Sequence, residues 1–226
     1  MLLLALDTST SAITVALHDG SGVRAERAVT DARRHTEHLA PLIEEVLAAG
    51  AVAPAELTDI AVGTGPGPFT GLRVGLVTAR TLGFALDRPI HGVPSLDVLA
   101  HQGSGLVTGD LLVATDARRK EVYWAVYAVR SGRVERLSAP AVDRPGDLED
   151  GVRALPTLGR GPLLYPDLFL APLPVHDVSA GALAEVAVGR IRSGTPMPVD
   201  ALYLRRPDAV PSVSTKSTVP DGWRGA

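Results

Sequence analysis

The chain of 226 residues contains no cysteine, which excludes disulfides, thiolate metal sites and a cysteine nucleophile. Aromatic residues make up only 4% of it, so the core must be aliphatic. No apolar run approaches the roughly 20 residues that span a bilayer. The apolar start "MLLLALDTST" lacks a basic region and is interrupted by Asp7, which predicts a buried strand rather than a signal peptide. The net charge of −3 gives no electrostatic footprint for nucleic acid, so any RNA contact is expected to come mostly from another chain.

Two stretches of the chain resemble each other at a constant offset. "LLLALDTSTSAITVAL" (2–17) aligns with "LLVATDARRKEVYWAV" (111–126), which places Asp7 on Asp116 and Ile13 on Val122. "SGVRAE" (21–26) then matches "SGRVER" (131–136), and "GTGP" (63–66) has a fainter match in "GRGP" (159–162). Three matches in the same order indicate two copies of one fold unit.

Each copy begins with three strands joined by short loops, which favours antiparallel pairing. In the first copy an amphipathic helix, a strand, a second helix to about Leu86, a strand and a last helix follow. This order predicts an α/β fold with two ribonuclease-H-like lobes in tandem, as in the actin, sugar-kinase and Hsp70 architecture. Prolines after "GRGP" exclude the long second helix in the second copy, so that lobe is expected to be reduced. The predicted domains are residues 1–102, residues 103–206, and a loose tail at 207–226 that is rich in Pro, Ser and Thr.

Two Asp-containing turns are candidates for chemistry. Asp7, Thr8 and Ser9 stand where this architecture can hold a metal-nucleotide, but the turn lacks the glycines that let backbone N–H groups approach phosphate. The alternative is that their side chains cap a hairpin turn. Asp116 is followed by "ARRK", which is either a solvated turn or a contact for an anionic partner.

No catalytic group is predicted. His35 and His38 are three residues apart, and no third metal ligand stands near them except Glu37, which points elsewhere on a helix. A Gly-X-Ser-X-Gly nucleophile elbow is absent. "GTGPGPFTGLRVGL" (63–76) is Gly-rich but lacks the Lys of a P-loop, so we interpret it as a tight turn from a strand into a helix.

The helix after that turn carries a stripe of small residues. Gly71, Gly75, Ala79 and Gly83 recur every four residues, although a helical glycine costs about 1 kcal/mol relative to alanine. The surrounding residues are mostly apolar, which indicates a helix buried on more than one side. One side can be its own sheet, and the other either the first helix of the same unit or another subunit.

These segments together resemble one family. "LLLALDTST", "HTEHLAPLIEEVL", "GPGPFTGLRVGL", "GVPSLDVLA", "TDARRKEVYWAVY" and a late "YLR" occur in the order typical of the bacterial TsaB (YeaZ) family. The resemblance covers about residues 1–206.

The resemblance implies a cytoplasmic, non-catalytic subunit. Its partner TsaD transfers a threonylcarbamoyl group to the adenosine beside the tRNA anticodon, and the ATPase TsaE joins the assembly. Contact with tRNA is then only indirect. TsaD carries a metal-binding His-X-X-X-His motif, which is absent here. No cofactor is required by this chain, although ATP or ADP can sit at the interface of the complex.

Members of that family pair through the two long helices of the first lobe, with themselves when alone or with TsaD. Carried over to this chain, the small-residue stripe lets the helices of two subunits approach. The predicted interface residues are His38, Leu39, Leu42, Ile43, Val46, Gly71, Leu72, Gly75, Leu76, Ala79 and Gly83.

Two other functions remain open at this point. An ATP-binding kinase or ATPase of the same fold would use Asp7, Thr8 and Asp116 between the lobes. A metallopeptidase would need the histidine pair that this sequence lacks.

Overall fold

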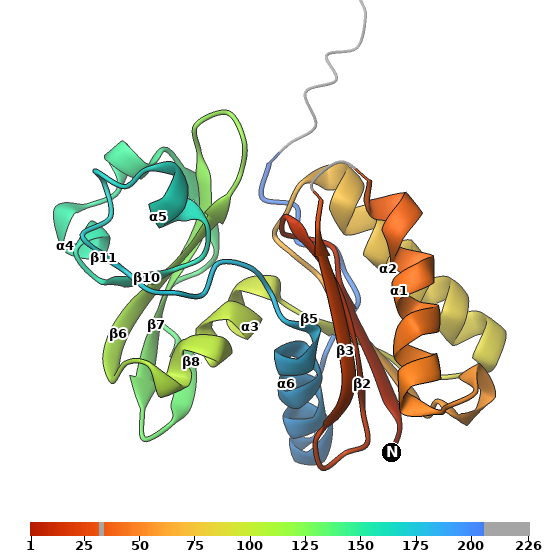
Figure 1. Ribbon diagram of the computed structural model, residues 1–226. Helices are drawn as coiled ribbons and strands as arrows, with labels where there is room; N and C mark the ends of the chain where they lie inside the picture. The colour runs from red at the N-terminus through yellow and green to blue at the C-terminus, as the bar shows by residue number, and fades with distance from the viewer. Residues whose placement is uncertain (32–33, 206–226) are drawn as a thin grey trace, which may run out of the picture.

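The computed structural model describes residues 1–31 and 34–205, so the predicted tail at 207–226 lies outside the described residues. Two mixed sheets stand side by side, each covered by helices (Figure 1). This arrangement confirms the predicted α/β fold of two lobes in tandem.

The first sheet has the order β3-β2-β1-β4-β5. Its strands are β1 (Leu3–Asp7), β2 (Ala12–His18), β3 (Val23–Thr30), β4 (Asp59–Gly63) and β5 (Ile90–Val93). The first three strands pair antiparallel, as their short loops predicted, whereas β4 and β5 run parallel to β1. Side chains along β1 alternate between two cores, with Leu3 and Ala5 on one face and Leu4 and Leu6 on the other.

The second sheet repeats this order as β11-β10-β6-β7-β8, and β9 also pairs with β7. Its strands are β6 (Gly109–Asp116), β7 (Val122–Arg130), β8 (Arg133–Arg136), β9 (Ala141–Asp143), β10 (Pro156–Leu158) and β11 (Ala171–Pro172). Here β6 takes the place of β1 and also ends in an Asp. The duplication read from the sequence is therefore a duplication of the sheet.

The helices on the outer face of the first sheet are long, and those on the second sheet that correspond to them are short. Helices α1 (His35–Gly50) and α2 (Phe69–Leu86) cover the outer face of the first sheet. The corresponding helices of the second lobe are the single turns α4 (Asp150–Arg153) and α5 (Gly161–Leu164). The second lobe is thus reduced, as the prolines predicted.

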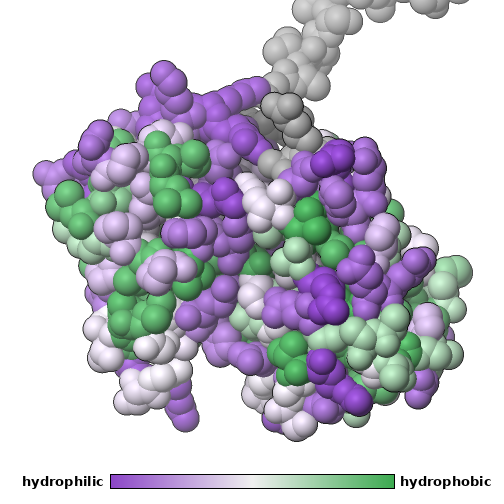
Figure 2. Space-filling model, in the orientation of Figure 1, coloured by the Kyte–Doolittle hydropathy of each residue, from purple (hydrophilic) through white to green (hydrophobic). Residues whose placement is uncertain are grey.

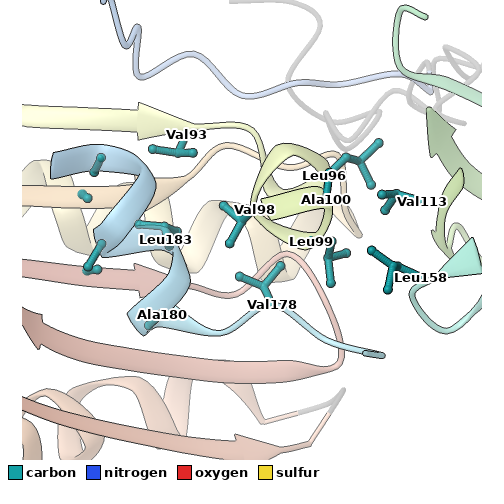
Figure 3. Close-up of a cluster of buried hydrophobic side chains, with 14 of the residues drawn as sticks. Val93, Leu96, Val98, Leu99, Ala100, Val113, Leu158, Val178, Ala180 and Leu183 are labelled. Atoms are coloured by element: carbon teal, nitrogen blue, oxygen red, sulfur yellow. The ribbon is translucent and has the colours of Figure 1, made fainter. Parts of the chain in front are cut away.

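The two remaining helices cross over between the lobes. Helix α3 (Ser95–Gln102) packs on the second sheet, and α6 (Ala180–Ser193) packs on the first. Val98 and Leu99 of α3 and Leu183 of α6 share one core between the sheets with strand residues that include Val113 and Leu158 (Figure 3). The predicted boundary at residue 102 separates the two copies in sequence, but in space each copy gives its last helix to the other.

Candidate functional site

Ten of the eleven predicted interface residues are buried within this chain, four on α1 and six on α2. The seven of them that are not glycine join the outer core of the first sheet, which contains Leu4, Leu6 and Val62. His38 alone keeps a partly exposed side chain, at 28%. The burial of the other ten does not support a contact with a second subunit, although Leu39 also lines a groove between α1 and α2, so the contact at these ten positions stays a prediction.

The small-residue stripe of α2 also faces inward. A Cβ added to Gly71 would lie 2.6 Å from the backbone oxygen of Thr8, and one added to Gly75 would lie 2.6 Å from Thr8 Oγ1. At Gly83 it would meet the side chain of Ile90 at 2.6 Å. The glycines therefore let α2 lie against the end of β1 and against β5. Our interpretation of the stripe as a place for another subunit is wrong, because the close neighbour is the chain's own first sheet.

Thr8, in the turn that follows β1, connects this turn to α2. Its hydroxyl donates to the backbone oxygen of Gly71 at 2.7 Å and accepts from the N–H of Gly75 at 3.0 Å. The side chain is 2% exposed, so both bonds are shielded from water. Thr8 is consequently a structural residue that fixes α2 on the sheet.

Asp7 lies at the centre of a buried hydrogen-bond cluster. Its Oδ1 accepts from the backbone N–H and the hydroxyl of Ser9, both at 2.7 Å, and its Oδ2 accepts from the Ser95 hydroxyl at 2.6 Å. Complete burial raises the pKa of the Asp7 carboxyl, although the hydrogen bonds from Ser95 and Ser9 oppose this. The structure of this turn agrees with the alternative in which its side chains cap a hairpin turn, because the Asp7 carboxylate accepts its hydrogen bonds from groups of this chain.

Sequence reasoning missed Ser95 in this cluster. Ser95 follows β5, and Asp7 ends β1, two parallel strands of one sheet. Carboxyl ends of parallel strands meet at one sheet edge, so the predicted strand order held the signal that brings the two side chains together.

One cavity between the lobes is small. It is bordered by Ser9, Thr10, His35, Thr115, Asp116, Arg118, Arg160 and Asp177, and its free volume is 20 Å³, room for about one water. Arg160 crosses it to bind both carboxylate oxygens of Asp177, at 2.6 to 3.0 Å. Among residues 1–31 and 34–205 no three His, Asp or Glu side chains are grouped as metal ligands. In the same ranges, no helix is both long and apolar enough to cross a membrane.

The exposed side of α2 carries large apolar side chains between its polar ones. Phe84 is 91% exposed, Val77 61% and Phe69 44%. A groove of 480 Å³ runs between the two helices, lined by residues that include Thr36, Ala40, Phe69, Arg73, Val74 and Val77. The guanidinium of Arg73 lies 3.6 Å from the Phe69 ring centroid, and the Tyr203 ring lies 5.2 Å from it.

Comparison with known proteins adds the family. Residues 8–158 match the family described as TsaD, tRNA N6-adenosine threonylcarbamoyltransferase. A protein of Escherichia coli named tRNA threonylcarbamoyladenosine biosynthesis protein TsaB is 34% identical over 74% of this chain and 75% of its own length. An uncharacterized protein of Mycobacterium leprae is 45% identical over 93% of this chain, which spans 56% of that relative's length.

A solved structure described as YeaZ from Pseudomonas aeruginosa is 30% identical. Its TM-score is 0.75, and the match covers 90% of this chain and 99% of that one. Sequence relatives and this structure agree with the resemblance found from the motifs. The chain belongs to the TsaB (YeaZ) family.

Proposed function

We propose that this chain is a non-catalytic subunit in the synthesis of tRNA threonylcarbamoyladenosine, and that it binds and activates the transferase TsaD. The name of the E. coli relative supports the pathway, and the match to the TsaD family supports a fold shared with the partner. Catalysis is assigned to TsaD. The internal bonding of Asp7, Thr8 and Ser9 supports this division, because the Asp7 carboxylate and the hydroxyls of Thr8 and Ser9 are engaged in hydrogen bonds within the chain.

The exposed apolar stripe of α2 is the observation that carries this proposal. Val77 and Phe84 are seven residues apart, so they lie on one helix face two turns apart. Arg73 and Arg80 complete the same face. Phe84 is 91% exposed, so covering its ring with a partner would stabilise the complex by removing apolar surface from water. Alternating arginine and apolar side chains resemble the composition of interface centres.

The proposed docking surface is the outer side of α1 and α2, opposite the small-residue stripe. The helices predicted from the family resemblance stay the proposed interface, but the contact residues change to Phe69, Arg73, Val77, Arg80 and Phe84. An interface of standard size would cover about 1,200–2,000 Å² in total.

The rest of the assembly follows the resemblance. We propose that TsaE joins the complex, that the chain pairs with itself through the same face when TsaD is absent, and that it works in the cytoplasm. This chain needs no cofactor in the proposal, and ATP or ADP would sit at the interface of the complex. TsaD would provide most of the contact with tRNA.

Val77→Glu tests the docking surface. The side chain is mostly exposed, so the variant should fold, whereas a carboxylate at the centre of an apolar interface should weaken TsaD binding at least tenfold. Leu170→Glu is the matched control, because Leu170 is 72% exposed in the second lobe, away from both helices. Binding would be measured with purified TsaD by light scattering and titration. Equal binding of wild type and Val77→Glu would contradict the proposal.

Gly75→Leu, in contrast, does not report on docking. Its side chain would collide with Thr8, so it tests the packing of α2 on its own sheet.

A further inference from the structure

A basic turn stands out on the second lobe. Arg118, Arg119 and Lys120 follow one another in the β6–β7 hairpin, and all three are exposed. The chain as a whole carries a net charge of −3, so this is a local reversal of its charge. Arg118 pairs with Asp116 at 3.0 Å. Lys120 has no hydrogen bond or ion pair within residues 1–31 and 34–205.

The backbone of this turn is strained. The φ angles of Arg118, Arg119 and Lys120 are 61°, 54° and 63°, so three successive residues with a Cβ occupy the left-handed region. Glycine adopts this conformation without strain, and other residues seldom do. Folding of the hairpin therefore does not explain the three cations. Strain of this kind concentrates at functional sites.

The turn is held closed by its own hydrogen bonds. The N–H of Ala117 donates to the Glu121 oxygen and the N–H of Glu121 donates to the Arg118 oxygen, each at 3.0 Å. The N–H of Arg118 donates to Asp116 Oδ1 at 2.7 Å. These hydrogen bonds fix the backbone that carries Arg118, Arg119 and Lys120. The top of the second lobe, where this hairpin rises in Figure 1, is hydrophilic in Figure 2.

An aromatic groove of 400 Å³ lies beside the basic turn. Phe69, Tyr123 and Tyr203 line it together with Arg118 and Arg119. Phe69 also lines the groove between α1 and α2, so the basic turn borders the proposed TsaD-binding face. Of these rings, Phe69 and Tyr203 are 44% and 46% exposed, whereas Tyr123 is buried. A basic rim next to exposed aromatic rings is the combination that single-stranded nucleic acid binds, by phosphate contact and by stacking.

We propose that the basic turn, Arg118–Lys120, contacts phosphate groups of the tRNA while TsaD holds it. This inference rests on the proposed function, and it departs from the expectation that this chain contacts tRNA only indirectly. Phosphate fits the turn better than an acidic protein segment does. A tRNA strand offers successive charges to successive cations, and the aromatic groove gives its bases a place to stack.

The test uses the complex with TsaD and an unmodified tRNA transcript. Arg119→Gly/Lys120→Gly removes two charges and also relieves the left-handed strain, so it should unfold at the same or a higher temperature than wild type. Arg130→Ala/Arg133→Ala is the matched control. It removes two exposed charges at the β7–β8 turn, which lies at the other end of the second sheet.

The affinity for tRNA would be measured by fluorescence anisotropy between 50 and 200 mM salt. In the glycine variant the slope of log affinity against log salt should fall by about 2, because about 1 is lost with each phosphate contact. The control and Lys120→Arg should keep the wild-type slope. An unchanged slope in the glycine variant would overturn the proposal.

Assembly is measured separately, by light scattering without RNA. If the glycine variant no longer binds TsaD, the turn is a protein contact and the RNA assignment is wrong. If wild type itself forms no complex, the proposed function fails, and this inference fails with it.

Discussion

Gly75→Ala tests how α2 packs on its own sheet. The added Cβ would lie 2.6 Å from Thr8 Oγ1, well inside van der Waals contact, while Leu6 at 3.4 Å is an ordinary neighbour. Thr8 is branched at Cβ and fully surrounded, so it cannot turn away without breaking its bonds to Gly71 and Gly75.

Opposing contributions determine how much Gly75→Ala changes the free energy of unfolding. Alanine gains about 1 kcal/mol over glycine in helix propensity. Overpacking a core costs about 1–3 kcal/mol, and each weakened buried hydrogen bond costs about 1 kcal/mol. The sum is a loss of about 2 kcal/mol in the free energy of unfolding. For a chain of this length it would lower the melting temperature by about 4–8 °C.

A double-mutant cycle with Thr8→Ala isolates the contact. Thr8→Ala alone should cost about 2 kcal/mol, because two buried hydrogen bonds are lost. In that background the nearest atom of residue 8 is its Cβ, 3.6 Å from the new methyl group, so Gly75→Ala should no longer destabilise. The coupling free energy should be about 2–3 kcal/mol, measured by urea unfolding followed by circular dichroism.

Gly189→Ala is the control for helix propensity. Gly189 lies inside α6 with nothing within 4 Å of an added Cβ, so this change should stabilise by about 1 kcal/mol. The reasoning would be refuted if Gly75→Ala stabilised the chain as much as Gly189→Ala does. In that case α2 would not rest on Thr8, and the stripe would again be free for a partner.

Three further changes test other parts of the structure. Burial raises the pKa of Asp7 above 3.8, so the native state binds this proton more tightly than the unfolded chain does. The free energy of unfolding of wild type relative to Asp7→Asn should therefore increase as pH falls through the native pKa toward 3.8. A difference in urea unfolding that is independent of pH would contradict this. Asp97 accepts from Tyr127 at 2.9 Å and from Arg190 at 2.8 Å, so Asp97→Ala should cost about 1–3 kcal/mol in urea unfolding, whereas Asp150→Ala, at a side chain 94% exposed, should leave the unfolding midpoint unchanged. A Cβ on Gly92 would lie 2.1 Å from the Pro198 oxygen, so Gly92→Ala should detach the segment after α6 and speed its cleavage by trypsin at Arg205, while Gly105→Ala, with open space around it, should not.

Much of the fold was predictable because its signals are local. The strand repeat, the antiparallel start of each lobe and the reduced second lobe follow from alternating apolar residues, short loops and prolines. The exchange of α3 and α6 was not predictable in this way. Both helices have an apolar face, and the sequence does not state which sheet that face covers.

For the candidate site, too, one part was predictable from local sequence signals and another part was not. By itself, the sequence determined that α2 must approach another backbone closely, because its glycines recur every four residues. Only the tertiary structure decided what it approaches. Thr8 precedes Gly75 by 67 residues, and the pairing of β1 with β4 brings the two together. The same packing turned the small residues inward and left Val77 and Phe84 to the solvent, because a helix that rests one face on a sheet must expose the opposite one.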